Sequence, residues 1–415
     1  MDLGKLYRML VVRSLRPLEF GSLTLVFPDG RREVFGGLGK SLSARIEVRN
    51  EDFFRKCVLF GPIGFGESFV DGDWTTPDLT RVIAWFILNS EKSEALETEE
   101  GRRPGSLNLL NLYNRILHLR RPNSVEKSRD NIREHYDLGN DFFKLWLDPS
   151  LTYSSAVFEP SDATLEAAQE EKYDRLCRKL HISAKDHVLE IGTGWGGFSL
   201  HAAGKYGCRI TTVTISEEQF RAAQGRIAEA GLSDRVEVVL RDYREITGQF
   251  DKIVSIEMLE AVGDRYLETY FAKCHEVLKP HGMLGVQMIT CPDRQFRILR
   301  DGVDFIQKHI FPGSLLLSAG RVNDAINATG TMNLHGYEDL GVHYAKTLRL
   351  WAERFAECEA EVRALGFDDS FLRKWMYYLR YCEAAFATRH ISVVQAIYTR
   401  PRNLSLRNPV YDLLP

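Results

Sequence analysis

The sequence predicts an α/β protein in which a doubly wound, mostly parallel sheet follows a smaller N-terminal α+β region. Three observations support this prediction. Apolar segments between residues 187 and 289 alternate with helical patterns, as they do in βαβ units. A glycine-rich turn at Gly192–Gly197 follows a buried apolar strand. Residues 1–90 instead combine a short helical start with hairpin and strand patterns.

The N-terminal region is expected to contain a hairpin, a further strand, a loop and a helix. The hairpin turn is Pro28-Asp29-Gly30, because these residue types favour tight turns. Within the glycine-dense segment Gly61–Ser68, Gly61–Gly66 is expected to be a loop. The expected strands cover Ser22–Phe27, Arg32–Phe35 and Ser43–Val48, and the helix covers Asp78–Leu88.

A charged segment separates this region from the rest of the chain. It includes Gly101-Arg102-Arg103-Pro104-Gly105, a composition typical of a linker. Leu107–Arg121 then interleaves apolar residues with polar ones and arginines, which is typical of a basic amphipathic helix. The predicted organisation is an N-terminal domain at 1–100, a linker and helix at 101–125, and a larger domain at 126–415.

The larger domain is expected to contain five parallel strands, two late helices and a last strand. The strands alternate with helical segments, which is typical of a doubly wound sheet. The expected strands are 187–191, 208–214, 235–239, 252–256 and 282–289; the helices are Tyr344–Leu365 and Phe371–Thr388, and the last strand is Ile391–Thr399.

Composition limits the class of protein. The 415 residues suffice for two domains, and 44% hydrophobic with 27% charged residues is ordinary for a soluble globular protein. A net charge of −3 neither favours nor excludes an anionic partner, and no pattern predicts nucleic-acid binding. The longest apolar run, Val82–Leu88, is far shorter than the roughly 20 residues of a membrane span. Seven cysteines without a CxxC pair predict reduced thiols in the cytoplasm, and no metal-ligand spacing occurs.

The most informative segment is Val188–Gly197, which has the pattern of a strand, a glycine-rich turn and the start of a helix. Glycines let the backbone approach a nucleotide-like ligand, and a helix N-terminus offers N–H groups to it. A dinucleotide site has nearly the same pattern. This segment alone therefore does not identify the ligand.

The ends of the following strands favour a different adenosine ligand over a dinucleotide. A dinucleotide site usually has an acid about 20 residues beyond the glycines. Here the second strand ends with the hydroxyls of Thr214 and Ser216, and the acids come later. Asp242-Tyr243 follows the third strand, where it could hydrogen-bond and stack on an adenine, and Glu257–Glu260 follows the fourth. This set resembles a class I S-adenosylmethionine methyltransferase, a Rossmann-like fold, more than a nicotinamide enzyme.

Motifs spread over nearly the whole chain resemble one family, the cyclopropane-fatty-acyl-phospholipid synthases with their mycolic-acid and plant relatives. No single motif is specific, but the set is. The motifs are Gly64–Gly72, His135–Phe143, Leu151–Ala156, Thr214–Gln219, Asp304–Gly313, His343–Leu348 and Tyr377–Phe386, with Gln395 in the last strand.

The resemblance implies a reaction. Family members add the methyl group of S-adenosylmethionine to the cis double bond of a phospholipid acyl chain, remove a proton and close a cyclopropane ring. A bicarbonate ion serves as the base in this family. The resemblance places Glu260, Ile289 and Tyr344 around that ion and gives Ser155 and Gln287 catalytic positions. The implied cofactor contacts are Tyr136, Tyr153, Ser154, Glu190, Gly192, Thr193, Gly194, Thr214, Ile215, Ser216, Gln219, Asp242 and Tyr243.

Two positions depart from the best-known bacterial pattern. Ser155 replaces a cysteine and Gln287 replaces a histidine, although plant-type members look similar at Gln287. Both side chains can still donate a hydrogen bond to an anion, yet the changes leave open whether the product is a ring. Cys382 matches a cysteine once assigned as the family nucleophile. A packed helical cysteine is the favoured interpretation, because the chemistry needs no covalent step.

Three functions stay open. The first is a cyclopropane synthase acting on unsaturated membrane phospholipids. The second is a relative that methylates the same alkene without ring closure, as in branched or furan fatty-acid pathways, and works with a separate reductase or desaturase. The third is a non-catalytic lipid-binding protein.

A phospholipid substrate would require contact with the membrane. The basic pattern of Leu107–Arg121 predicts peripheral binding to anionic lipid at the inner face of the membrane, although helix packing explains its apolar face at least as well. The expected loop at Gly61–Gly66 could flex against lipid. The resemblance also allows a homodimer.

Overall fold

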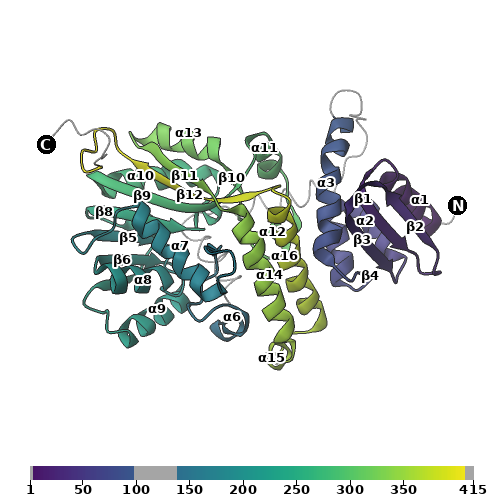
Figure 1. The fold of residues 1–415 in the computed structure, drawn as a ribbon, viewed down its shortest axis with the longest axis horizontal. Coiled ribbons are helices and arrows are strands. Elements are labelled where there is room, and N and C mark those ends of the chain that lie inside the picture. The colour runs from purple at the N-terminus through teal and green to yellow at the C-terminus, as the bar shows by residue number, and fades with distance from the viewer. Residues whose placement is uncertain (1–2, 98–137, 407–415) are drawn as a thin grey trace. The chain divides into compact units, whose positions relative to one another are not determined.

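The computed structural model describes residues 3–97 and 138–406, which form two compact units (Figure 1). The chain passes through the units more than once. Unit 1 contains the described residues 3–97, 301–312 and 344–391, and unit 2 contains 138–300, 313–343 and 392–406. The predicted domain limits near residues 100 and 125, the segment Leu107–Arg121 and the predicted cofactor residue Tyr136 lie outside the described residues.

Unit 1 contains a four-stranded sheet with the order β2-β1-β3-β4. β1 (Phe20–Val26) and β2 (Arg32–Gly36) pair antiparallel, so the predicted hairpin is confirmed. Gly30 in its turn has a φ of 81°, in the left-handed region that glycine adopts without strain. β3 (Leu38–Val48) pairs parallel with β1 and antiparallel with β4 (Trp74–Thr75).

The prediction of a flexible loop at Gly61–Gly66 is wrong. These residues lie within α2 (Asp52–Val70), which continues across a kink at Gly61 with φ 56° and ψ −137°. Gly66 is buried, and a Cβ added there would lie 2.6 Å from the Phe305 ring and 2.9 Å from the Tyr377 ring. The glycines therefore permit close packing and do not provide flexibility.

The other helices of unit 1 come from both ends of the chain. α1 (Leu3–Leu15) and α3 (Leu79–Glu97) accompany α2 in the N-terminal part. The single helix expected at Tyr344–Leu365 is two helices, because Cys358 leaves the helical conformation between them. The late elements are α12 (Phe305–His309), α14 (Gly341–Glu357), α15 (Glu359–Ala364) and α16 (Asp369–Ala387), of which α14 begins in unit 2.

Unit 2 contains the larger sheet, with the strand order β11-β12-β9-β8-β5-β6-β7. The five strands from β9 to β7 are parallel, as predicted. β12 pairs antiparallel with β9, and β11, which the sequence did not predict, pairs antiparallel with β12. The bounds are β5 (His187–Ile191), β6 (Arg209–Thr214), β7 (Val236–Leu240), β8 (Phe250–Ile256), β9 (Leu278–Cys291), β11 (Asn333–Asp339) and β12 (Ser392–Thr399), and the short β10 (Leu317–Ser318) pairs with β9.

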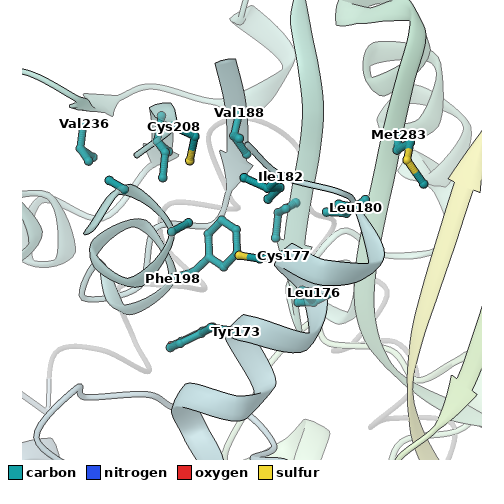
Figure 2. Close-up of a cluster of buried hydrophobic side chains, with 14 of the residues drawn as sticks. Tyr173, Leu176, Cys177, Leu180, Ile182, Val188, Phe198, Cys208, Val236 and Met283 are labelled. Atoms are coloured by element: carbon teal, nitrogen blue, oxygen red, sulfur yellow. The ribbon is translucent and has the colours of Figure 1, made fainter. Parts of the chain in front are cut away.

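Helices cover both faces of this sheet. α7 (Leu165–Lys179), α8 (Gly197–Tyr206) and α9 (Glu217–Glu229) share one hydrophobic cluster with the strands, and Figure 2 shows these side chains gathered together. The crossover through α10 (Leu267–Val277) runs the opposite way along the sheet, so the right-handed rule places α10 on the other face. α13 (Ala319–Thr329) packs against α10.

The remaining described helices of unit 2 include α6 (Asn140–Trp146) and α11 (Asp293–Asp301). Within residues 3–97 and 138–406, no helix combines the length and the apolar character needed to cross a membrane.

Candidate active site

The turn between β5 and α8 has the geometry of a nucleotide cradle. Gly192, Gly194 and Gly196 have φ values of 99°, 53° and 85°, a region that side-chain-bearing residues avoid. A Cβ added to Gly197, the first residue of α8, would lie 2.5 Å from the Tyr173 hydroxyl. The glycines therefore bring the backbone close to the sheet edge, where the N–H groups of the α8 N-terminus can receive a ligand.

Glu190 lies at the end of β5, directly before this turn. Its carboxylate is buried, and Ser199 Oγ donates to Oε2 over 2.5 Å. Burial raises the pKa of Glu190 to about 7. Thr193 is also buried and accepts a hydrogen bond from Thr212 Oγ1 over 2.8 Å, so the turn is fixed to β6.

The residues predicted at the end of β6 form the start of α9. Thr214 Oγ1 donates to Gln219 Oε1 over 2.9 Å, and the Ser216 N–H donates to Thr214 Oγ1 over 3.1 Å. Ser216 caps α9 by accepting the Gln219 N–H over 3.3 Å. Ile215 is half-buried between them. Contact of these four residues with a cofactor stays a prediction.

Asp242 and Tyr243 follow β7, as predicted, and an arginine accompanies them. Arg244 donates from Nε to Asp242 Oδ1 over 2.8 Å and from Nη2 to Oδ2 over 2.7 Å. Tyr243 packs edge-on against Tyr270 with ring centroids 5.3 Å apart. Arg244 was not among the predicted residues, although an arginine two residues beyond an aspartate can orient its carboxylate.

Aromatic side chains surround the glycine turn. Tyr153 packs against Phe143 and Trp146 of α6, with ring centroids 5.4 and 5.5 Å apart. Trp195, inside the turn, packs 5.2 Å from Phe143 and donates from Nε1 to Asn140 Oδ1 over 2.7 Å. The sequence did not identify Asn140 or Trp195 as site residues, although both lie within the quoted motifs.

A second turn follows β8 and lies beside the glycine turn. A Cβ added to Gly192 would lie 3.2 Å from Met258 Cγ. Ser255 Oγ also donates to the Ile191 carbonyl over 3.1 Å. The cradle at the end of β5 and the acidic turn at the end of β8 are therefore immediate neighbours.

Glu260 in this turn is a buried carboxyl group. Its Oε1 accepts the Ile289 N–H over 2.5 Å, whereas its Oε2 has no hydrogen-bond partner among the described residues. Burial and then the nearby charge of Glu257 raise the pKa of Glu260 to about 8. Glu260 is therefore mainly neutral near pH 7.

Ser155, Gln287 and Glu257 form one hydrogen-bonded group in unit 2. The Ser155 N–H and Gln287 Nε2 both donate to Glu257 Oε1 over 2.8 Å. Gln287 Nε2 also donates to the Ser155 carbonyl over 3.2 Å, and the side chains of Ser155 and Gln287 are fully buried. The structure thus joins two predicted residues through a glutamate to which we had given no role.

Three of the residues to which the resemblance gives places around a bicarbonate ion or catalytic positions donate to protein acceptors. Gln287 Nε2 donates to Glu257 and to the Ser155 carbonyl. Ser155 Oγ donates to the Ala156 carbonyl over 3.1 Å, and the Ile289 N–H donates to Glu260. In this structure Gln287, Ser155 and Ile289 therefore direct these hydrogen bonds to the protein and not to an anion.

Lys172 of α7 supports the loop that carries Ser154 and Ser155. This lysine is fully buried, and Nζ donates to Ser154 Oγ over 2.6 Å. Burial lowers the pKa of Lys172 to about 7, whereas the charges of Glu257 and Asp148 act in the opposite direction. The sequence could have indicated this role of Lys172 only through its place on the buried face of an amphipathic helix. One sequence alone does not distinguish such a lysine from a solvated one.

Two predicted catalytic residues belong to unit 1. Tyr344 is buried in α14, with its ring 4.5 Å from Phe386 and 6.0 Å from Trp351. Cys382 lies in α16, and burial raises the pKa of its thiol far above the ordinary value. A thiol in this state is a poor nucleophile. Among the described residues, no group of histidine, cysteine, aspartate and glutamate side chains could hold a metal ion.

Comparisons with known proteins identify relatives of most of the chain. Tuberculostearic acid methyltransferase UfaA1 of Mycobacterium tuberculosis is 39% identical over 384 residues, covering 90% of this chain and 86% of the relative. Cyclopropane-fatty-acyl-phospholipid synthase of Escherichia coli K12 is 34% identical over 368 residues, covering 88% of this chain and 91% of the relative.

A solved structure agrees with these sequence relatives. The mycolic acid cyclopropane synthase CmaA1, complexed with SAH and CTAB, superposes with a TM-score of 0.61 at 30% identity, covering 66% of this chain and 98% of that one. Residues 123–396 match the family described as mycolic acid cyclopropane synthetase. The chain therefore belongs to the mycolic acid cyclopropane synthetase family, and it has the fold of a class I S-adenosylmethionine-dependent methyltransferase.

Proposed function

We propose that this protein transfers a one-carbon unit from S-adenosylmethionine to the cis double bond of an unsaturated phospholipid acyl chain and closes a cyclopropane ring. One observation carries the proposal: the glycine cradle and the acidic turn touch at Gly192 and Met258. A methyl donor in the cradle would then have buried carboxyl groups beside it. An alkene is a weak nucleophile, so such close positioning is the main contribution a protein can make.

The cradle fits S-adenosylmethionine in several respects. The N–H groups at the start of α8 and the glycine backbone suit its polar amino-acid part, and the rings of Tyr153 and Trp195 lie at the same turn. Bound there, S-adenosylmethionine would supply an electrophilic methyl group on a sulfonium centre. Aromatic faces favour a cation, so these rings suit the sulfonium charge. The proposed contacts are Tyr153, Ser154, Glu190, Gly192, Thr193, Gly194, Thr214, Ile215, Ser216, Gln219, Asp242 and Tyr243, together with Tyr136 outside the described residues.

The acyl-chain side of the site is assigned to Ser155, Glu260, Gln287 and Ile289. Glu260 supports this assignment because it is buried and largely neutral, so it can lie against a hydrocarbon chain at little desolvation cost. A catalytic role for Tyr344, which belongs to unit 1, stays a prediction. Cys382 is given a structural role, because its thiol is held protonated.

A second candidate is methylation of the same alkene without ring closure. The relative with 39% identity is named a tuberculostearic acid methyltransferase, and Ser155 and Gln287 differ from the best-known cyclopropane-forming pattern. Such an enzyme would work with a separate reductase or desaturase. A non-catalytic role fits less well, because a protein without chemistry to perform would gain nothing from a buried, ionisable Glu260.

The decisive experiment is expression of the full chain in a host that lacks cyclopropane lipids, followed by mass spectrometry of the fatty acids. We expect a gain of one CH2 per modified chain with the fragmentation of a ring. The same mass gain as a methyl or methylene branch would establish the second candidate. Unchanged lipids from a folded protein that binds S-adenosylhomocysteine would overturn both. A Gly192→Val variant, whose cradle is blocked, is the matched inactive control.

We further propose that the protein works as a peripheral protein at the cytoplasmic face of the membrane. The substrate supports this, because a double bond within a bilayer is reached only from its surface. The basic segment Leu107–Arg121 is the proposed contact with anionic lipid. Co-sedimentation with vesicles that contain phosphatidylglycerol should be strong at low salt and weak at high salt. No binding at low salt would refute the proposal. Sedimentation velocity of the same sample would test the expected homodimer.

A further inference from the structure

We infer that Glu257 is the base that removes the proton in this reaction, in place of a bicarbonate ion. The inference rests on the proposed function. It starts from the hydrogen-bond donors of Ser155 and Gln287, which both donate to the Glu257 carboxylate. Both the Ser155 N–H and Gln287 Nε2 donate to Glu257 Oε1 over 2.8 Å. A carboxylate from the chain thus accepts hydrogen bonds from both residues to which the resemblance gives catalytic positions.

A one-way chain of hydrogen bonds fixes the direction of the Gln287 amide. Lys179 has only donors, and its Nζ donates to Gln395 Oε1 over 2.8 Å. Gln395 Nε2 must then donate, and it reaches Gln287 Oε1 over 3.1 Å. The Gln287 NH2 group therefore points away from Gln395 and toward Glu257. The amide orientation follows from the terminal lysine and carboxylate, and each step of the chain lies within unit 2.

The backbone at Glu257 supports a functional role. Its φ is 48°, in the left-handed region that a non-glycine residue adopts at a cost of about 1–2 kcal/mol. The Glu257 N–H donates to the Gln287 carbonyl over 2.7 Å, which holds the residue in this conformation. Unusual backbone conformations of this kind are concentrated at active sites, because the fold must over-determine them. Here the result is a carboxylate directed at the loop of Ser155.

Glu260 and Glu257 are suited to different roles. Burial and the charge of Glu257 raise the pKa of Glu260, so Glu260 keeps its proton near pH 7. Two neighbouring carboxyl groups that share a site divide in this way, with one neutral and one ionised. The charge of Glu257 also raises the pKa of Lys172 against the larger effect of burial, so the two side chains lie close enough to interact.

The proton step balances with Glu257 alone. After methyl addition, the acyl chain carries a new methyl group next to a carbocation. The Glu257 carboxylate takes one proton from that methyl group, and the C–H electron pair forms the C–C bond that closes the ring. The proton then passes from the Glu257 carboxyl group to water. In the uncyclised alternative, a hydride shift first moves the cation to the methylated carbon. The same proton loss then gives a methylene group, so either product needs this base.

The test uses the purified full chain with vesicles of dioleoyl phosphatidylglycerol, in buffer freed of carbon dioxide. We expect the wild-type rate of lipid modification to stay unchanged whether or not bicarbonate is added. Glu257→Gln should lower turnover at least about 100-fold, because loss of a general base typically costs 10²–10⁴-fold. Its affinity for S-adenosylhomocysteine should stay within about twofold. Glu229→Gln, an exposed change in α9, is the matched control.

A second variant tests replacement of the missing group. Glu257→Gly removes the side chain and suits the left-handed backbone, so we expect folding to be retained. Added bicarbonate or formate should restore part of its activity, by about tenfold over the unsupplemented variant. Thermal unfolding with S-adenosylhomocysteine confirms that each variant is folded.

Two results would overturn the inference while the proposed function stands. The first is a wild-type enzyme that loses its rate without bicarbonate and regains it on addition. The second is a Glu257→Gln variant that keeps more than about half of the wild-type rate. A folded wild-type protein that modifies no unsaturated lipid would instead overturn the proposed function, and the role of Glu257 as base would be rejected with it.

Discussion

Gly192 and Met258 meet at the carboxyl ends of two neighbouring strands, and a Cβ on the glycine would come within 3.2 Å of the methionine side chain. This contact joins the cradle after β5 to the acidic turn after β8. Parallel neighbouring strands place their carboxyl ends at one edge, which is where doubly wound sheets bind their ligands. The backbone therefore places the turn proposed to hold the methyl donor directly beside the turn proposed to face the acyl chain.

Gly192→Ala should weaken binding of S-adenosylhomocysteine. The residue has a φ of 99°, which disfavours alanine, and its Cβ would press on Met258. We expect an increase in Kd of about tenfold to a hundredfold by isothermal titration calorimetry. Gly225→Ala is the control, since Gly225 lies in α9 with nothing within 4 Å of an added Cβ. Equal Kd values for the two variants would contradict this account of the cradle.

Glu260→Gln should make stability less dependent on pH. The pKa of Glu260 is about 8 in the folded protein, against 4.5 for an ordinary glutamate. The folded state holds a proton that the unfolded state releases, so this stabilisation is full below about pH 4.5 and is lost as pH rises toward 8. As pH rises from 5 to 8, the free energy of unfolding of the glutamine variant should therefore increase by ~1–3 kcal/mol relative to that of wild type.

Urea unfolding at several pH values measures this effect. Glu229→Gln, at an exposed position of α9, is the control and should follow wild type. Parallel curves for Glu260→Gln and wild type would mean that burial does not hold the Glu260 proton.

Lys172→Met should have the opposite pH signature. Burial lowers the pKa of Lys172 from 10.5 to about 7, so the unfolded chain binds a proton that the folded chain releases. The stabilisation is full above about pH 10.5 and is lost as pH falls toward 7, and the methionine variant should lack this slope. Loss of the hydrogen bond to Ser154 should also lower turnover about tenfold to a hundredfold, because the Ser154–Ser155 loop loses its support.

Lys185→Met, at an exposed lysine, is the control for this experiment. The comparison cancels effects that are common to all lysines at high pH. Equal pH slopes for the two variants would show that Lys172 titrates as an ordinary solvated lysine.

Gly66→Ala should destabilise unit 1. An added Cβ would overlap the rings of Phe305 and Tyr377 at 2.6 and 2.9 Å, and overpacking of this kind costs ~1–3 kcal/mol. The free energy of unfolding, measured in urea, reports the loss. Gly204→Ala in α8 is the control, because its nearest neighbour is 4.0 Å away. A neutral Gly66→Ala would favour the flexible loop that the glycine content first suggested.

The sequence was sufficient wherever a short pattern determines a local conformation. The five parallel strands were predicted from apolar segments that alternate with helical patterns. The glycine turn was predicted because its backbone conformations are ones that glycine adopts without strain. The helical conformation of Gly61–Ser68 did not follow, because α2 is stabilised there by packing that no local pattern reports. β11 was missed because its sequence, Asn333–Asp339, is mostly polar and forms an exposed sheet edge.

The site was predictable in part for the same reason. Ser155, Gln287 and Glu260 were proposed from motifs; the structure joins Ser155 and Gln287 through Glu257 and bonds Glu260 to Ile289. Glu257 itself was not recognised, because its importance depends on hydrogen bonds from a loop about a hundred residues away. Hydrogen-bond partners that are distant in the sequence are determined by the fold, and the residue spacing of a single sequence does not predict them.

The way unit 1 is assembled from separate chain segments has a consequence for biosynthesis. α16 packs against α2 and α3, so the N-terminal residues cannot complete their packing until residues 369–387 have left the ribosome. The strands β5 to β11 are synthesised before α16, at a time when α2 and α3 still lack their contacts with it. The nascent chain therefore cannot mature one domain after another, as many proteins of this length do. The described residues 3–97 therefore depend on α16, from the other end of the sequence, for part of their packing.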